Sequence, residues 1–264
     1  MEIKYYDIGL NLFCRQFPEP EKIISGAENE GVCCILTGTD MKENSRIRDF
    51  VKTHNVFGTA GIHPHNADQA KQEDFEQMEK IFSENEKIVA VGECGLDYDR
   101  MFSARENQIR CLEKHIMLAE KLHMPLFLHE RSAEDDFVRR FKKHPEICKN
   151  SVVHCFTGNK KTLDRYLSMG FSIGITGWIC DDRRGGELRE AVSMIPLERI
   201  LVETDAPYLT PKNVPNLNRT NVPQNIKYVV KELAKYMRVP EEELMENARK
   251  NTERIFHLKP MPPL

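Results

Sequence analysis

The sequence predicts an α/β fold built as a (β/α)8 TIM barrel, and three observations lead to it. Short apolar runs with the length of buried strands alternate with longer helical segments along the chain. Eight such strand–helix units fit into 264 residues, the usual size of a barrel of this kind. Most of the runs end on His, Glu or Asp, as expected where catalytic side chains gather at the carboxyl ends of barrel strands.

The expected strands are apolar runs at residues 4–9, 32–38, 56–62, 88–93, 125–129, 151–155, 171–176 and 200–204. A doubly wound open sheet would show the same alternation, but the loops that lead into the helices lack a glycine-rich dinucleotide fingerprint. The chain has neither a linker nor a shift in composition. We therefore expect a single domain over residues 1–264.

Helix signals lie between the expected strands. Ser103 and Glu106 are spaced as a capping box ahead of apolar residues at helical spacing. Asn159 is placed to cap a later helix, and Gly170 stands where that helix would end. Pro240 is expected to begin the last helix, with three glutamates in its first turn, where the helix dipole favours negative charge.

The bulk composition is that of an ordinary globular protein. Charged residues make up 30% of the chain, and the net charge of −3 with a pI of about 6.3 argues against a generally basic nucleic-acid-binding surface. The N-terminal segment lacks the apolar core of a signal peptide, and no run has the roughly 18 apolar residues of a membrane span. The eight cysteines include no C-x-x-C pair. We expect a cytoplasmic monomer with reduced thiols and no membrane association.

Glu93 ends the apolar run IVAVGE and is the first candidate for metal binding. A carboxylate at the end of a buried strand is costly unless it has a partner. That partner is either an arginine in a salt bridge or a metal ion, and Glu93 alone does not distinguish the two. The histidines at the ends of neighbouring strands favour the metal.

His129 and His154 end two successive strands, and Asp205 ends a later one. A single strand-end histidine is more often structural, but two on adjacent strands favour ligation, because neutral imidazole is a common ligand of divalent ions. Asp205 is either a cap or turn residue, or a metal ligand that also acts as general base. The residues expected to bind metal are Glu93, His129, His154 and Asp205, with Glu93 and Asp205 as catalytic residues.

Further candidates lie close to the strand ends. His63 and His65 of AGIHPH are either solvated residues of a rigid loop or ligands of a phosphate or metal, and these interpretations are balanced. Arg131 and the pair Arg183–Arg184 are candidates for phosphate contacts. Of these, His63, His65 and Arg131 are the expected phosphate-binding residues. Aromatic side chains that either pack or stack on nucleobases are Tyr98, Phe156, Trp178 and Tyr208.

Taken together, these motifs resemble one family. The segments AGIHPH, VGECGLDYD, HER at 129–131, VVHCFTG, IGITGWICDDRRG and LVETDAPYL occur in an order and spacing similar to the TatD family of metal-dependent deoxyribonucleases. The resemblance runs from DIGLNL at 7–12 to the final helix, and ETDAPYL combined with GECGLD is highly specific. Within the family, DIGLNL and GITGWICDDRRG look most like the bacterial TatD branch.

The resemblance implies a hydrolase of the amidohydrolase-like superfamily that cuts phosphodiester bonds with one or two divalent cations. Its expected substrate is single-stranded DNA, with RNA as a second candidate, cut as a 3′-to-5′ exonuclease in DNA repair or degradation. By this resemblance Glu93 is the shared metal-bridging carboxylate, His129 and His154 bind one metal, and Asp205 is the remaining ligand. Phosphodiester chemistry favours Mg²⁺ as the ion, while this ligand set also suits Mn²⁺ or Zn²⁺.

Two positions depart from the family pattern. Many relatives begin D-x-H-x-H, with two metal-binding histidines on the first strand, whereas this chain has Gly9 and Asn11 there. Gly9 offers no side chain and Asn11 only a weak oxygen ligand, so the occupancy of one metal position is open. Glu130 stands where similar relatives have Cys, and strand alternation turns it away from the lumen, so we expect little effect.

Two other functions are consistent with the sequence. A metal-dependent ester or amide hydrolase, for example an aminoacyl-RNA deacylase, would use the same site, although cyclic-amide hydrolases often carry a carboxylated lysine where this chain has Glu93. The other is a catalytically inert nucleic-acid-binding barrel that lost activity with the first-strand histidines. Metal analysis and an EDTA-sensitive digestion separate the inert barrel from a nuclease, and comparing turnover of an oligonucleotide with that of an aminoacyl-RNA separates the ester hydrolase.

Overall fold

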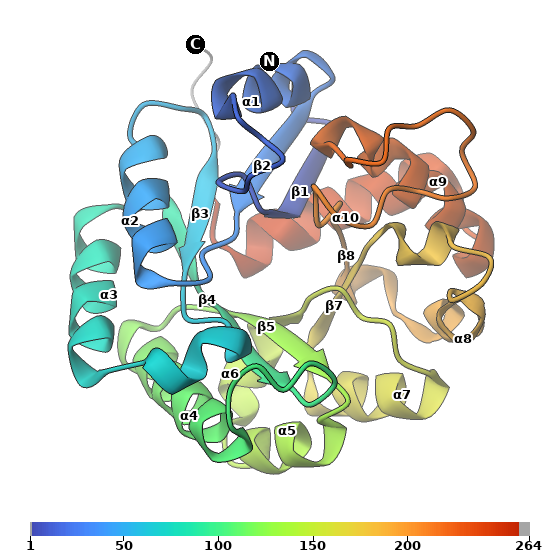
Figure 1. Ribbon diagram of the computed structural model, residues 1–264. Helices are drawn as coiled ribbons and strands as arrows, with labels where there is room; N and C mark the ends of the chain where they lie inside the picture. The colour runs from blue at the N-terminus through green and yellow to red at the C-terminus, as the bar shows by residue number, and fades with distance from the viewer. Residues whose placement is uncertain (1, 259–264) are drawn as a thin grey trace. The chain divides into compact units, whose positions relative to one another are not determined.

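The structure is a computed structural model that describes residues 2–258, so residues 1 and 259–264 of the expected domain lie outside the described part. Eight parallel strands alternate with helices and are ordered β1 to β8 as in the sequence, which is the predicted (β/α)8 TIM barrel (Figure 1). The chain clusters into two compact units. The first holds the residues up to 36, 155–167 and those from 172 onward, and the second holds 37–154 and 168–171. The single domain stays a prediction.

The first unit contains four strands. β1 (Tyr5–Leu10) pairs in parallel with β2 (Val32–Leu36), and β7 (Ser172–Ile175) pairs with β8 (Ile200–Val202). An isolated parallel bridge joins Leu10 to Ala206. Its helical segments are α1 (Pro20–Asn29), α7 (Lys160–Met169), η2 (Gly177–Cys180), α8 (Gly186–Ala191), η3 (Val192–Met194), η4 (Leu197–Arg199), η5 (Pro223–Asn225), α9 (Ile226–Met237) and α10 (Glu241–Ile255).

The helix ends predicted in α7 and α10 are confirmed. Asn159 Oδ1 accepts a hydrogen bond from the backbone N–H of Thr162 (3.1 Å) at the start of α7. Gly170, just after α7, has a φ of +104°, a conformation that favours glycine. α10 begins directly after Pro240 and carries glutamates at 241, 242 and 243 in its first turn.

Asp7 in β1 is a completely buried carboxyl group. Its Oδ1 accepts hydrogen bonds from the backbone N–H groups of Thr204 (2.8 Å) and Gly9 (3.3 Å), and its Oδ2 contacts the Thr204 hydroxyl. Burial raises the pKa of Asp7 to about 7, against the lowering effect of the Thr204 hydrogen bonds. The folded protein therefore keeps a proton that an unfolded aspartate loses near pH 4.

This proton makes the stability of the fold depend on pH. Because the folded pKa lies above the unfolded value, the folded state binds more protons between about pH 4 and pH 7, and the free energy of unfolding falls as pH rises through this window. Asp7→Asn keeps the hydrogen-bonding groups of the protonated acid and does not titrate. Its stability advantage over the wild type should grow by about 3 kcal/mol from pH 5 to pH 8, at about 1.36 kcal/mol per pKa unit.

Urea unfolding of both proteins at pH 5 and pH 8 measures this difference. Asp49→Asn is the matched control, because the Asp49 side chain on α2 (Met41–Phe50) is 60% exposed. The unfolding free energy of the control should differ from that of the wild type by the same amount at both pH values. Unfolding free energies of Asp7→Asn that stay parallel to the wild type across this range would contradict the raised pKa.

The second unit contains the other four strands. β3 (Phe57–Ala60), β4 (Ile88–Asp97), β5 (Leu126–Arg131) and β6 (Val152–Val153) pair in parallel in this order. All ten residues of β4 are buried, as expected for a strand covered on both faces. Helices α2, α3 and α4 flank β3 and β4 in Figure 1. The helical segments of this unit are α2, η1 (Pro64–Gln69), α3 (Gln72–Glu84), α4 (Arg105–Leu122), α5 (Glu134–Phe141) and α6 (Pro145–Lys149).

β4 is longer than the sequence predicts. The apolar run ends at Glu93, but the strand continues to Asp97. After a register shift, Gly95 pairs with His129 of β5 and Asp97 pairs with Arg131. Pairing with β5 thus keeps residues 94–97 in β4, although their composition is not typical of a strand.

The predicted capping box at the start of α4 is wrong. The helix begins at Arg105, and its N-cap, Ala104, makes no side-chain cap hydrogen bond. The Ser103 hydroxyl instead donates to the backbone carbonyl of His65 (2.8 Å) and accepts from the N–H of Asp68 (3.1 Å). A tertiary contact to η1 has taken the hydroxyl that the local pattern assigned to the helix.

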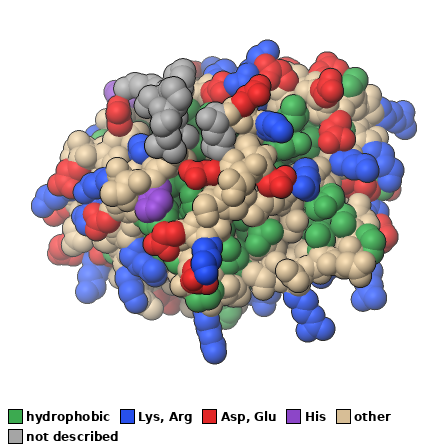
Figure 2. All heavy atoms as spheres, turned by 90° about the horizontal axis from the view of Figure 1, so that it is seen from above, with side chains coloured by type: hydrophobic (Ala, Val, Ile, Leu, Met, Phe, Trp, Pro, Cys, Tyr) green, Lys and Arg blue, Asp and Glu red, His purple; other side chains and the backbone are tan. Residues whose placement is uncertain are grey.

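Charged side chains of both signs are interspersed over the face drawn in Figure 2, in keeping with the small net charge of −3. Among residues 2–258, no helix is both long enough and apolar enough to cross a membrane.

Candidate metal centre

The carboxyl ends of β3 to β6 carry a histidine–carboxylate cluster. Because the strands are parallel, residues at or just beyond these ends lie at one edge of the sheet. β4 contributes two carboxylates and β5 one histidine, while the segments after β3 and β6 contribute the other three histidines. The members of the cluster are His63, His65, Glu93, Asp97, His129 and His154.

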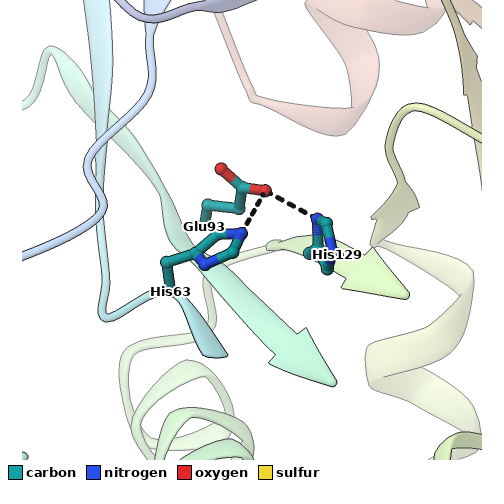
Figure 3. Close-up of side chains that lie close together, drawn as sticks. All are labelled: His63, Glu93 and His129. Atoms are coloured by element: carbon teal, nitrogen blue, oxygen red, sulfur yellow. Dashed lines mark hydrogen bonds and ion pairs between the residues drawn. The ribbon is translucent and has the colours of Figure 1, made fainter. Parts of the chain in front are cut away.

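Three imidazole nitrogens converge on one oxygen of Glu93. Glu93 Oε1 lies 2.7 Å from His154 Nε2 and 3.0 Å from His129 Nδ1. His63 Nε2 lies 3.3 Å from the same oxygen, and Figure 3 shows the rings of His63 and His129 on either side of the carboxylate. The ligand atoms of His63, Glu93 and His129 all lie within 4.8 Å of one another.

This geometry fits a divalent cation. One carboxylate oxygen offers two lone pairs, so it cannot accept three well-formed hydrogen bonds at once. Imidazole nitrogens and a carboxylate oxygen at these separations are instead the donor set that binds a divalent ion. His63, Glu93 and His129 therefore form a candidate metal site, with His154 beside it.

Glu93 is ionised in this setting. The residue is only 6% exposed, and burial alone would raise its pKa. The nearby His154 and His63, together with hydrogen bonds from His129 and His154, outweigh burial and hold the pKa of Glu93 well below its usual range. The cluster thus has a fixed negative charge at its centre, as a cation requires.

Asp97 is the second carboxylate of the cluster, and it orients His129. Asp97 Oδ2 accepts hydrogen bonds from His65 Nε2 (2.8 Å) and His129 Nε2 (3.2 Å). With Nε2 held as the donor to Asp97, the Nδ1 atom of His129 faces Glu93. A carboxylate behind a histidine in this way fixes both the ring orientation and the tautomer of a metal ligand.

His129 bridges the two carboxylates. Burial lowers its pKa, but the hydrogen bonds to Asp97 and Glu93 raise it by more, so the net pKa lies above its usual value. The proton on Nδ1 occupies the line between His129 and Glu93. Because a metal ligand must release its proton, a cation that binds here displaces this one, and its affinity falls as the pH is lowered.

His63 is held as a neutral imidazole. Burial lowers its pKa to about 4. Its Nδ1 accepts the backbone N–H of His65 (3.1 Å), so the ring proton lies on Nε2, the atom that faces Glu93, and a cation bound there would have to displace this proton. Of the two roles that the sequence left open for this residue, the position next to Glu93 favours metal binding over phosphate binding.

The buried His115 of α4 supports the segment that leads to His63. Its Nε2 accepts the backbone N–H of Ile62 (3.0 Å), and its Nδ1 donates to the carbonyl of Cys111 (2.7 Å). Burial lowers the pKa of His115 to about 4, so it stays neutral. His115 is therefore a structural residue of the core.

Asp205 belongs to the first unit, where it follows β8 with a left-handed φ of +52°. The Asn11 side-chain N–H₂ donates to Asp205 Oδ1 (2.9 Å) and to the carbonyl of Ala206 (3.3 Å). Asn11, which the sequence suggested as a weak metal ligand, therefore uses its amide to orient Asp205.

A side chain at position 9 would meet the carboxylate of Glu203. Glu203 is completely buried, and its Oε1 accepts the backbone N–H of Cys155 (2.6 Å). Its Oε2 occupies the space in which a Cβ at Gly9 would lie. A histidine at position 9 would require the Glu203 carboxylate to move.

His65 and Arg131 are the more exposed of the candidate phosphate-binding residues. The His65 side chain is 30% exposed, and the Arg131 side chain is 40% exposed at the end of β5. Arg131 Nε lies 3.1 Å from Asp99 Oδ2. Glu130 Oε1 accepts the N–H of Ala133 (2.7 Å), so its carboxylate serves the turn that precedes α5.

Fold and cluster together define a class of protein, the metal-dependent hydrolases built on (β/α)8 barrels. The model of the family described as TatD related DNase matches residues 6–257. The chain belongs to this family, as the resemblance predicts.

Two bacterial relatives illustrate the similarity. A protein of Pantoea sp. (strain At-9b), named 3′-5′ ssDNA/RNA exonuclease TatD, is 39% identical over 259 residues, which cover 96% of this chain and 99% of the relative. A protein of the same name from Pantoea vagans (strain C9-1) is 38% identical with the same coverage. Among solved structures, a TatD homologue from Escherichia coli K12, YJJV, has a TM-score of 0.88 at 26% identity, covering 98% of this chain and 100% of that one.

Proposed function

We propose that this protein is a divalent-metal-dependent 3′-to-5′ exonuclease that hydrolyses phosphodiester bonds in single-stranded DNA and RNA. The observation that carries the proposal is the convergence of three imidazole nitrogens on Glu93 Oε1. Full-length relatives named 3′-5′ ssDNA/RNA exonuclease TatD supply the substrate class and the polarity.

The residues proposed to hold the metal are Glu93, His129, His154 and Asp205, with His63 added from the geometry of the cluster. The cation would neutralise charge on the phosphate oxygens and lower the pKa of the attacking water. Mg²⁺ remains the first ion to test, while three nitrogen donors favour Mn²⁺ or Zn²⁺ by ligand softness. With Gly9 and Asn11 in place of the first-strand histidines, one or two ions fit the proposal.

Asp205 is proposed to accept the proton of the attacking water. The Asn11 amide orients the Asp205 side chain through Oδ1, and the carboxylate would serve as the base. His65 and Arg131 are proposed to hold the phosphate, since both are partly exposed donors at the edge of the cluster. Glu93 stays ionised and balances the charge of the metal.

The proposal extends to the cellular setting of the protein. Six buried cysteines suit a reducing compartment, which supports a cytoplasmic location: Cys33, Cys34, Cys94, Cys111, Cys148 and Cys180. We propose that the protein acts as a monomer in DNA repair or degradation, with single-stranded nucleic acid as its partner.

The deciding experiment is the product ladder of a 5′-end-labelled single strand incubated with Mg²⁺, Mn²⁺, Zn²⁺ or EDTA. A ladder that shortens progressively from the 3′ end with a divalent ion, and full-length strand with EDTA, is the expected result. Intact strand under every condition would overturn the proposal. Release of an amino acid from an aminoacyl-RNA without shortening of the strand would support the ester hydrolase instead.

A further inference from the structure

Met101 and Phe102 form an exposed apolar pair beside the histidine–carboxylate cluster. Among the described residues, five large apolar side chains are substantially exposed, and only these two are consecutive. Phe102 is 66% exposed, and Met101 is 47% exposed. Leaving an aromatic ring in water forgoes the free energy that its burial would supply, so an exposed ring at a functional edge indicates a ligand.

The ring of Phe102 is linked to the candidate metal site by two ring contacts. Its centroid lies 4.7 Å from that of His65, with the rings nearly perpendicular at 85°. The His65 ring in turn lies 4.2 Å from the ring of His63, whose Nε2 faces Glu93. A perpendicular contact covers at most one face of the Phe102 ring, which leaves a face of this 66% exposed residue for another flat group.

The loop that carries Phe102 is held on its N-terminal side by Asp97. Asp97 Oδ1 accepts the backbone N–H groups of Asp99 (3.0 Å) and Arg100 (2.9 Å). The same carboxylate contacts His65 and His129 through its other oxygen. One residue thus positions both the metal ligand and the start of the loop.

The loop is held equally firmly after Phe102. The Ser103 hydroxyl donates to the carbonyl of His65 (2.8 Å), and the N–H of Ala104 donates to Asp68 Oδ1 (2.9 Å). Gln108 Nε2 donates to the carbonyl of Ser103 (2.9 Å). Since the loop is ordered by these contacts, little conformational entropy is lost when Phe102 meets a ligand.

Cationic side chains lie on the same loop and the adjoining strand end. Arg131 Nε and Arg100 Nε lie 3.1 and 3.9 Å from the single carboxylate of Asp99. The Arg100 side chain is 61% exposed and the Arg131 side chain 40% exposed, so both guanidinium groups can reach a phosphate in solvent. An exposed aromatic ring next to exposed arginines is the combination by which proteins bind single-stranded nucleic acid without sequence preference.

We propose that Phe102 forms a nucleobase subsite, in which a base near the 3′ end of the strand stacks on its ring while the adjoining phosphate lies at the metal cluster. The inference rests on the proposed nuclease function and adds the residue that holds the substrate base. The subsite accepts any of the bases, because each presents a flat π face. Arg100 and Arg131 would contact the phosphate backbone of the bound nucleic acid.

The test measures binding apart from cleavage. Fluorescence anisotropy of a single-stranded oligonucleotide labelled at its 5′ end, recorded in EDTA, gives the Kd without hydrolysis and leaves the 3′ end free for the subsite. Phe102→Ala should raise the Kd by roughly 5- to 150-fold, the usual range for the loss of one base–aromatic stack, while Phe102→Trp should bind as the wild type does. Met117→Ala is the matched control, because Met117 on α4 is equally exposed at 67%.

A series of strands with one abasic nucleotide at each of the three 3′-terminal positions identifies the stacked base. The wild type should lose affinity at one of these positions, and Phe102→Ala should show no further loss there, because the same stack is missing from either partner. A purely structural role of Phe102 would make the two losses add. An unchanged Kd for Phe102→Ala, or additive losses at every position, would overturn the subsite.

The two proposals fail in different ways. A wild type that binds single strands but cleaves none with any ion defeats the proposed nuclease and leaves the subsite supported by the Kd series. A wild type that cleaves normally, with Phe102→Ala indistinguishable from it in KM and Kd, defeats the subsite alone.

Discussion

Glu93→Gln is expected to lower the hydrolysis rate of a single-stranded oligonucleotide by at least about 1,000-fold. The neutral amide keeps the size of the side chain but removes the charge on which His63, His129 and His154 converge. A cation bound there would lose its balancing anion, and with it several kcal/mol of charge stabilisation in the transition state. Single-turnover rates at saturating Mg²⁺ or Mn²⁺ measure the effect, and His129→Ala should behave similarly.

The matched control is Glu120→Gln, which changes a carboxylate that also contacts an imidazole. Glu120 Oε1 lies 2.6 Å from His144 Nδ1, but this pair is partly exposed on the surface. The control should keep the wild-type rate, and circular dichroism should show the native fold in both variants. If Glu93→Gln retained more than about a tenth of the wild-type rate, the assignment of Glu93 would be wrong.

The fold could be predicted because its signals are local and repeated. Each of the eight predicted strands overlaps an observed one, since a buried parallel strand must be an apolar run and a crossover helix must separate it from the next. Boundaries were less predictable. β6 contains only Val152–Val153, whereas β4 extends beyond Glu93 because pairing with β5 continues through Gly95 and Asp97.

Asp97 was missed as a site residue because β4 was predicted to end at Glu93. Asp97 lies two and four residues beyond Gly95 and Glu93, so strand alternation places it on the same side of β4 as Glu93. With the strand predicted to end at Glu93, this alternation could not be applied, and Asp97 looked like a loop residue. The glycine at 95 hid the pattern, because it offers no side chain between the two carboxylates.

Other local features depend on contacts that no local pattern contains. The Ser103 hydroxyl is bound to the His65 carbonyl, 38 positions away, so its capping pattern could not be realised. The contact between Gly9 and Glu203 could not be predicted from local sequence either, because the two residues are far apart in the chain. Likewise, the partner of Asn11 is Asp205.

Asp97→Asn is expected to weaken metal binding by about 10- to 100-fold, the usual cost of losing a carboxylate behind a histidine ligand. Because the backbone N–H groups of Asp99 and Arg100 hold Oδ1, the new N–H₂ group would face His65 and His129. His129 Nε2 must then act as an acceptor, which moves the ring proton to Nδ1. Nδ1 faces Glu93 and can bind a cation only if the remaining ring proton lies on Nε2, where in this variant it would face the new N–H₂ group instead of a carboxylate.

The midpoint of activity against metal concentration should therefore rise for Asp97→Asn, and excess metal should restore most of the rate. This rescue separates it from Glu93→Gln, in which the missing charge cannot be supplied by more metal. Asp164→Asn, an exposed carboxylate on α7, should leave the midpoint unchanged. If the midpoint of activity against metal concentration were the same in Asp97→Asn as in the wild type, His129 would keep its orientation without the Asp97 carboxylate. Glu93 alone would then determine which nitrogen of His129 binds the metal.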